Sequence, residues 1–213
     1  MEVKIVDRGE KEVLIALSDV KVRFANALRR VMIAEVPTLA IDELAIRENT
    51  SLLYDEQLAL RLALVPLKTD LKDYKEDEQI TLTLKATSPE KAGHTMVYSK
   101  ELIASDPKVE AASENIPIVK LISTEREIGG IKTVARQKIA LDAIARWGIG
   151  REHAKWQPVT ICSYRNESDG DERSLLFTVE GDGSLPVDEI ILEAARIMQE
   201  KCERMVEALK ELS

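Results

Sequence analysis

The sequence predicts an α+β protein, in which two long amphipathic helices accompany strands grouped in more than one short sheet. Two observations support this. Most of the 213 residues fall into short segments with alternating apolar and polar side chains, which is typical of half-buried strands. Two longer segments, 20–35 and 186–212, consist of helix formers with apolar residues every three or four positions. The charge distribution separately sets the C-terminal part apart, because the acidic excess is confined to residues 167–213, which carry 5 basic and 13 acidic side chains.

The composition excludes several classes of protein. Apolar residues make up 45% of the chain and charged residues 32%, as expected for a folded domain with a core. The net charge of -8 argues against a free-standing nucleic-acid binder, so we expect no direct contact with nucleic acid. No apolar run approaches the ~20 residues of a membrane span, and five of the first ten residues are charged. We therefore expect a cytoplasmic protein without a membrane anchor.

The first 47 residues predict a hairpin, a helix and a strand. Alternation over residues 3–17 around the turn residues 7–10 indicates two paired strands. Residues 20–35 contain neither Gly nor Pro, and Pro37 ends this helix. Its apolar stripe comprises Phe24, Ala25, Leu28, Val31 and Met32. The alternation resumes at residues 38–47 and predicts the next strand.

The middle of the chain predicts mostly strands. A short helix over 55–64 ends before Pro66, and its first turn is acidic, as the helix dipole favours. We expect strands at 80–84, 96–98, 116–122, 134–144 and 159–164. Residues 148–157, GIGREHAKWQ, are rich in glycine and charge, so we expect a surface loop there rather than core.

The last 40 residues predict a strand at 175–179 and a helix from Pro186 to Leu212. This helix is the strongest prediction in the sequence, because one apolar stripe runs along about seven turns. One interpretation is a helix that covers the core of its own domain. The alternative is a stripe that a second chain completes.

The sequence offers little for catalysis or metal binding. The phosphate-binding, dinucleotide-binding, zinc-protease and serine-hydrolase motifs are all absent. His153 lies in a loop without an obvious nucleophile, so we interpret it as a structural hydrogen-bonding residue. Cys162 and Cys202 are 40 positions apart, and we expect both to be small buried side chains. The residues alone therefore indicate an interaction protein.

Four stretches in a fixed order resemble a known family. They are FANALRRVMIAEVPTLAID, ENTSLLYDEQLALRLALVPL, HTMVYSKEL and GIGREHAKWQPV. Together they resemble the α-like subunits of multisubunit RNA polymerases, and most closely the archaeal D-type subunits. These are related to bacterial α and to the third-largest subunit of eukaryotic RNA polymerase II. The resemblance covers essentially the whole chain.

The resemblance implies a discontinuous dimerisation domain, here residues 1–42 with 167–213, and an inserted β-rich domain at 43–166. It implies that the chain is a non-catalytic part of a DNA-directed nucleotidyltransferase. The dimerisation domain pairs with a smaller subunit, L. The pair is the platform on which the largest and second-largest subunits assemble, and small subunits N and P are further expected partners.

The resemblance also assigns roles to residues. Asn26, Arg29 and Arg30 are expected to dock on a large subunit, with both arginines facing the second-largest one. The expected interface with subunit L comprises Phe24, Leu28, Val31, Ile190, Ile191, Ile197, Met198, Met205 and Leu209.

The sequence departs from some family members in its cysteines. Many members hold an iron–sulfur cluster in a cysteine-rich insertion before the last strand, but here only SYRNESDGDE fills that gap. Eukaryotic members have a zinc-binding cysteine cluster in the inserted domain, and residues 85–100 contain no cysteine. We therefore expect neither cofactor. The competing hypothesis is a small standalone enzyme with the HAKW loop as its active site.

Overall fold

The computed structural model describes residues 1–71, 78–167 and 174–211, and these residues form two compact units. Unit 1 comprises Met1–Thr38 with Gly148–Ser213, and unit 2 comprises Leu39–Trp147. These units differ from the predicted domains, because residues 148–166 belong to unit 1 and not to the inserted domain that was expected at 43–166. The physical reason is strand pairing: β10 (Val159–Asn166) hydrogen-bonds along its whole length to β11 (Ser174–Gly181).

Unit 1 contains a four-stranded antiparallel sheet. The predicted N-terminal hairpin is confirmed as β1 (Glu2–Arg8) paired with β2 (Glu12–Ser18), and the strand order is β1-β2-β11-β10. Residues directly opposite each other share a face of a sheet. Ile5, Ile15, Phe177 and Tyr164 therefore form one row across all four strands, and the Tyr164 and Phe177 ring centroids are 5.7 Å apart.

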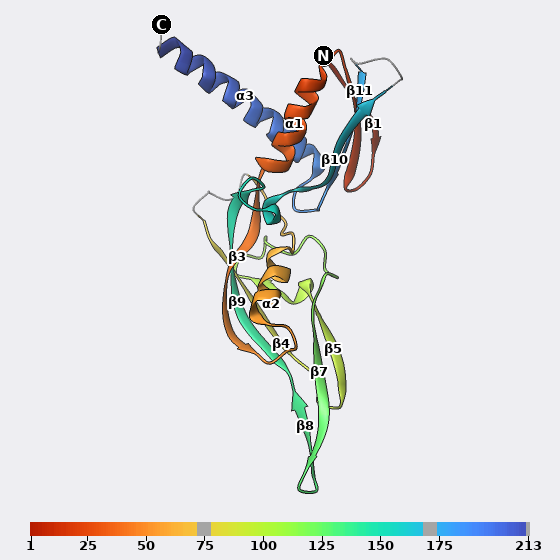
Figure 1. The fold of residues 1–213 in the computed structure, drawn as a ribbon, viewed down its shortest axis with the longest axis vertical. Helices are drawn as coiled ribbons and strands as arrows, with labels where there is room; N and C mark the ends of the chain where they lie inside the picture. Colours follow the sequence, from red (N-terminus) through yellow and green to blue (C-terminus); the bar gives the residue numbers. More distant parts are fainter. Residues whose placement is uncertain (72–77, 168–173, 212–213) are drawn as a thin grey trace. The chain divides into compact units, whose positions relative to one another are not determined.

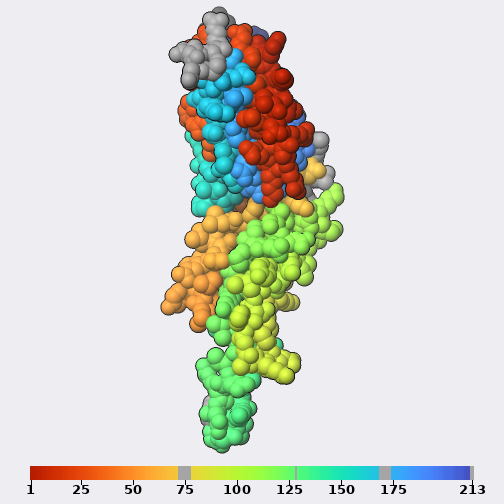
Figure 2. Space-filling model, turned by 90° about the vertical axis from the view of Figure 1, so that its right-hand side faces the viewer, coloured from red at the N-terminus to blue at the C-terminus, as the bar shows by residue number. Residues whose placement is uncertain are grey.

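Two helices pack on the apolar face of this sheet, as Figure 1 shows. Helix α1 (Val22–Ala34) contacts β10, and α3 (Val187–Glu211) contacts α1, β2 and β11. The other face of the sheet is open in Figure 2, where β1 and β2 are red, β11 is blue and β10 is cyan. Both predicted helices are thus present. Helix α3 begins one residue after Pro186, and Leu212 lies outside the described residues.

The GIGREHAKWQ segment differs from the expected surface loop. It contains a short 3-10 helix, η2 (Ala154–Trp156), and Trp156 is only 2% exposed. A side chain at Gly148 would lie 2.4 Å from the Trp156 ring, and one at Gly150 would lie 2.2 Å from the Ile33 carbonyl oxygen. The glycines therefore let the backbone approach close enough to bury the tryptophan, which a count of glycines and charges does not reveal.

Unit 2 is mostly β-structure. One sheet has the order β3-β9-β4-β6, formed by β3 (Pro37–Asn49), β9 (Lys138–Ile149), β4 (Ile80–Thr87) and β6 (Ile103–Ala104). The other has the order β5-β7-β8, formed by β5 (Gly93–Tyr98), β7 (Pro117–Ile128) and β8 (Ile131–Arg136). The short helix α2 (Asp55–Ala63) and a 3-10 turn, η1 (Ser99–Glu101), complete the unit.

The core of unit 2 is built from aliphatic side chains, including Leu58, Leu62, Leu82, Leu121 and Leu141. The predicted strand at 134–144 is in fact two strands, because the chain leaves β8 at Gln137 and enters the other sheet as β9. In both units the α+β class is confirmed. Among the described residues, no helix combines the length and hydropathy that a membrane span requires.

Candidate protein-interaction surface

Helix α1 turns most of its apolar stripe into unit 1. Ala25 and Met32 are fully buried, and Leu28 and Val31 are 5% and 6% exposed. Phe24, one turn before Leu28, remains 37% exposed. Of the three predicted interface residues on this helix, Phe24 therefore offers the most surface to another chain.

Helix α3 divides into two halves with different surroundings. In its first half, Val187, Ile190 and Ala194 are buried in unit 1. Three more of the predicted interface residues lie half-buried beside them: Ile191, Ile197 and Met198. An ion pair between Lys201 of α3 and Glu35 at the end of α1 marks the point where the packing between the helices stops.

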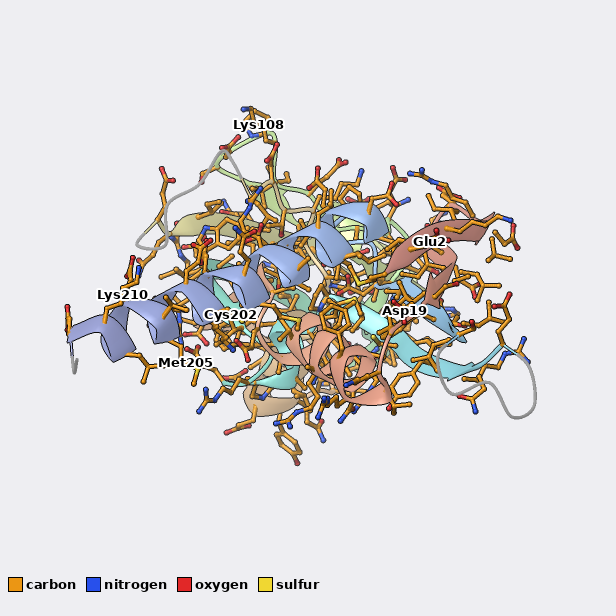
Figure 3. All side chains as sticks on the ribbon, turned by 90° about the horizontal axis from the view of Figure 1, so that it is seen from above. Glu2, Asp19, Lys108, Cys202, Met205 and Lys210 are labelled. Carbon is orange, nitrogen blue, oxygen red and sulfur yellow. The ribbon has the colours of Figure 1, made fainter. Side chains whose placement is uncertain are left out.

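The second half of α3 leaves the rest of unit 1, and every residue in 199–211 is exposed. Met205, Val206 and Leu209 are 65%, 51% and 55% exposed, and with Cys202 they follow the spacing i, i+3, i+4, i+7. This spacing places all four on one side of the helix. We call these four residues the terminal stripe. Figure 3 shows Cys202, Met205 and Lys210 on the part of α3 that extends past α1.

The expectation that Cys202 is buried is wrong, because Cys202 lies in the exposed second half of α3. Cys162 on β10 is half-buried, and its thiol donates to the Arg29 carbonyl oxygen at 3.9 Å. Burial raises the pKa of the Cys162 thiol to about 11, although the nearby Arg29 charge partly opposes the shift. Cys162 is therefore an unreactive thiol, whereas Cys202 is accessible.

Strand β1 adds exposed apolar surface that the sequence analysis did not single out. Val3 and Ile5 are 60% and 52% exposed, although they lie opposite the buried Leu17 and Ile15 on the same face of the sheet. Helices α1 and α3 cover this face over β2, β11 and β10, but they leave the side chains of Val3 and Ile5 on β1 exposed. The alternation of β1 shows which side chains share a face. That β1 is an edge strand follows only from the sheet order.

The three residues of α1 that are expected to dock on a large subunit differ in their environments. The Arg29 guanidinium donates to the Asn26 side-chain oxygen from Nε at 3.3 Å and from Nη2 at 3.1 Å. Arg29 is half-buried, whereas Arg30 is exposed and makes no ion pair within the described part of the chain. Arg30 lies ~200° around the helix from Leu28, so it points away from the buried stripe.

The side chain of His153 in the HAKW loop makes contacts within the loop itself. His153 Nδ1 accepts a hydrogen bond from the Lys155 amide at 3.1 Å and caps η2, and its ring meets the Trp156 ring edge-to-face at a centroid distance of 6.5 Å. These contacts come from the same loop, and they bring no nucleophile to the imidazole. In the described ranges, no three His, Cys, Asp or Glu side chains are close enough together to hold a metal ion. The exposed apolar side chains of α1, α3 and β1, by contrast, are of the kind that binds another protein.

Comparisons with known proteins identify the family to which the chain is similar. The family model for the RNA polymerase Rpb3/Rpb11 dimerisation domain matches residues 15–202. The chain is 32% identical to the DNA-directed RNA polymerase subunit Rpo3 of Methanosarcina acetivorans, covering 100% of this chain and 99% of that protein. It is 34% identical to the Rpo3 of Natronomonas pharaonis (98% and 97%) and 31% identical to that of Pyrococcus furiosus (100% and 98%).

The alignment with the Methanosarcina acetivorans protein extends over 281 positions, whereas this chain has 213 residues, so that relative contains segments with no counterpart here. The match nevertheless spans both ends of both chains, and the family model includes α1 and most of α3. The chain therefore belongs to the family of RNA polymerase Rpb3/Rpb11-type dimerisation domains and, within it, to the α-like Rpo3 subunits of DNA-directed RNA polymerase.

Proposed function

We propose that this chain is an assembly subunit of an archaeal RNA polymerase. It pairs with the smaller subunit L through α1 and α3, and the pair forms the platform on which the second-largest and largest subunits assemble. Small subunits N and P complete the proposed set of partners, and the complex acts in the cytoplasm. The family membership supports a role in the polymerase, and the surface of unit 1 supports the pairing.

The terminal stripe is the observation that carries the proposal. All 13 residues of the helix segment 199–211 are exposed in the described structure. Isolated helices of that length are marginal in water, so tertiary packing normally supplies their stability. The terminal stripe makes one side of this segment apolar, and charged residues occupy the opposite side. A partner that covers the terminal stripe would both stabilise the helix and remove its apolar side from water.

The pairing surface that we propose is narrower than the predicted set of residues. Met205 and Leu209 lie in its exposed part together with Phe24, whereas Ile191, Ile197 and Met198 form its half-buried border. Leu28, Val31 and Ile190 are buried within unit 1, so they support the surface from beneath. Substitution of these three should disturb folding before pairing.

For docking on the second-largest subunit, we assign the main contact to Arg30. Its guanidinium is exposed and can form a bidentate contact with a carboxylate. Arg29 and Asn26 bind each other, so they hold the surface of α1 around Arg30.

The experiment is reconstitution with Arg30→Glu. The pair with subunit L should form normally, but recruitment of the second-largest subunit should fail. Arg126→Glu, an identical charge change at an exposed position of β7, is the matched control and should assemble like the wild type. Assembly of Arg30→Glu at wild-type yield would remove the docking role.

We further propose that the chain is not itself catalytic and holds no iron–sulfur cluster or zinc. Its two cysteines lie on separate elements, β10 and α3. An iron–sulfur cluster held by cysteines alone would need more thiolates than the sequence contains. For zinc, no three His, Cys, Asp or Glu side chains of the described residues lie close enough together to hold the ion. Elemental analysis of the anaerobically purified protein should give far less than one metal per chain, and a stoichiometric metal would contradict the proposal.

A further inference from the structure

Helix α2 of unit 2 is apolar on two opposite sides. Leu58 and Leu62 are fully buried in the core of the unit. Leu60 is two positions from each of them, so it lies ~200° around the axis, on the opposite side of the helix. Leu60 is 56% exposed, and Leu64, one turn later, is 54% exposed. The Leu64 amide donates to the Leu60 carbonyl oxygen at 3.2 Å, so both side chains belong to the same outer side. We call Leu60 and Leu64 the outer leucines.

A groove with a volume of about 280 Å³ lies beside the outer leucines, between α2 and β3. Its apolar lining includes Leu44 and Ile46 of β3, and Ala59 and Ala63 of α2. Each alanine directly precedes one of the outer leucines in the sequence, so the apolar surface continues from the groove onto the outer side of the helix. Figure 1 shows α2 beside β3. Single exposed apolar residues need no explanation, whereas a continuous apolar surface beside a groove indicates an interaction site.

The charges of the groove have one sign. In the described structure, the charged residues that line it are Asp42, Asp55 and Glu56, and all three are acidic. The Asp42 carboxylate forms an ion pair with Arg146, so its charge is compensated. Asp55 accepts a hydrogen bond at 2.7 Å from the neutral side chain of Asn49. Neither Asp55 nor Glu56 forms an ion pair within the described residues, so two negative charges remain uncompensated.

The helix dipole alone does not account for this surface. Acidic residues in the first turn stabilise a helix, which would explain Asp55 and Glu56 by themselves. The dipole does not favour leucine on the outer side of a helix, where a surface helix normally carries polar residues. A partner that is apolar and carries a basic residue would account for both the outer leucines and the uncompensated charges.

We propose that α2 and the groove beside it dock an apolar segment of another polymerase subunit that carries a lysine or an arginine. Apolar side chains of the segment pack on the outer leucines and enter the groove, and the basic side chain pairs with Glu56. An apolar helix face laid into a groove is a recurrent mode of peptide recognition. An acidic segment is disfavoured, because it would place like charges beside Asp55 and Glu56. The inference goes beyond pairing and docking through unit 1, and it rests on the proposed function only in naming the polymerase as the source.

Hydroxyl-radical footprinting tests the inference in the intact complex. The outer leucines should be oxidised at least fivefold more slowly in the assembled polymerase than in the pair with subunit L alone. The buried Leu58 and Leu62 are the internal control and should stay unreactive in both samples, which shows that unit 2 is folded. Equal oxidation of the outer leucines in a normally assembled polymerase would overturn the docking site and leave the proposed function intact.

Substitution of the outer leucines tests the apolar contact. Glutamine has a helix preference close to that of leucine, so Leu60→Gln with Leu64→Gln should preserve α2. When this variant pair competes with an equal amount of wild-type pair for the other subunits, its incorporation should be at least tenfold lower. Ile103→Gln with Ile131→Gln is the matched control in unit 2, at positions that are 72% and 68% exposed, and it should be incorporated like the wild type. Equal incorporation of the two double variants would overturn the inference.

Charge reversal tests the chemistry of the partner. Glu56→Lys places a positive charge beside the groove and should lower incorporation at least tenfold in the same competition. Glu90→Lys is an identical charge change at an exposed position between β4 and β5, and it should have no effect. Incorporation of Glu56→Lys as efficiently as the wild type, or more efficiently, would show that the partner offers no basic residue there and would overturn the inference.

Three further outcomes are also decisive. If the double leucine variant does not fold by circular dichroism, the footprinting of the wild type decides alone. Protection of the outer leucines that already appears in the isolated chain, and rises with its concentration, would mean that a second copy occupies the groove and would overturn the choice of partner. A chain that never enters the polymerase would overturn both this inference and the proposed function.

Discussion

Truncation of the terminal stripe should weaken the pair with subunit L without unfolding the chain. The double variant Met205→Ala with Leu209→Ala removes two side chains that are 65% and 55% exposed in the isolated chain. Alanine is the strongest helix former, so α3 should persist. Complete burial of a Leu or Met side chain stabilises by ~1.5–3 kcal/mol.

More than half of each side chain remains exposed, so a partner that covers the stripe would gain ~1–1.5 kcal/mol from each residue. Loss of both corresponds to a ~30- to ~150-fold increase in Kd. Isothermal titration or sedimentation with purified subunit L measures this change.

Leu192→Ala is the matched control for the double variant. Leu192 is 67% exposed on the same helix, but it lies almost three turns before the terminal stripe along the axis and ~100° around the axis from Leu209. It should pair with nearly wild-type affinity. A double variant that binds subunit L within threefold of the wild type, or a control that loses as much affinity as the double variant, would contradict the role of the terminal stripe in pairing.

Three further predictions concern unit 1. At pH 8, iodoacetamide should modify Cys202 at least tenfold faster than Cys162, since a thiol with a pKa of about 11 is ionised in roughly one molecule per thousand, and mass spectrometry of tryptic peptides checks this. Trp156→Ala should lower the free energy of unfolding by ~3–5 kcal/mol in urea titrations, because the ring is 2% exposed; an effect below ~1 kcal/mol would contradict its place in the core. Gly150→Ala should cost ~1–3 kcal/mol, because the new Cβ would lie 2.2 Å from the Ile33 carbonyl oxygen, whereas Gly9→Ala, with nothing closer than 3.6 Å, should change stability little.

The sequence predicted the elements of unit 1 because their signals are local. The alternation in β1 and β2 and the stripe of α1 each depend on a few neighbouring side chains. The same local signal could not show that α3 has two halves. An apolar stripe has the same spacing whether it meets its own sheet, as at Ile190, or is left exposed, as at Leu209.

What the sequence could not predict depends on pairing between distant segments. Val3 and Ile5 are exposed because β11 inserts next to β2 and leaves β1 at the edge. Arg29 and Arg30 are neighbours in the sequence, but the packing of α1 against β10 half-buries only Arg29. The end of the pairing between β7 and β8 likewise depends on the contacts of Ser88 with Arg136 and Gln137, almost 50 residues further along the chain.

We propose that this chain becomes complete only as one half of a pair. The most direct test is the mass in solution of the 23.8-kDa chain, measured by sedimentation equilibrium alone and after co-expression with subunit L. We expect self-association or aggregation of the isolated chain, because the terminal stripe and the side chains of Val3 and Ile5 remain uncovered, and a stable 1:1 complex with subunit L. A stable monomer that remains separate from subunit L at micromolar concentration would contradict it.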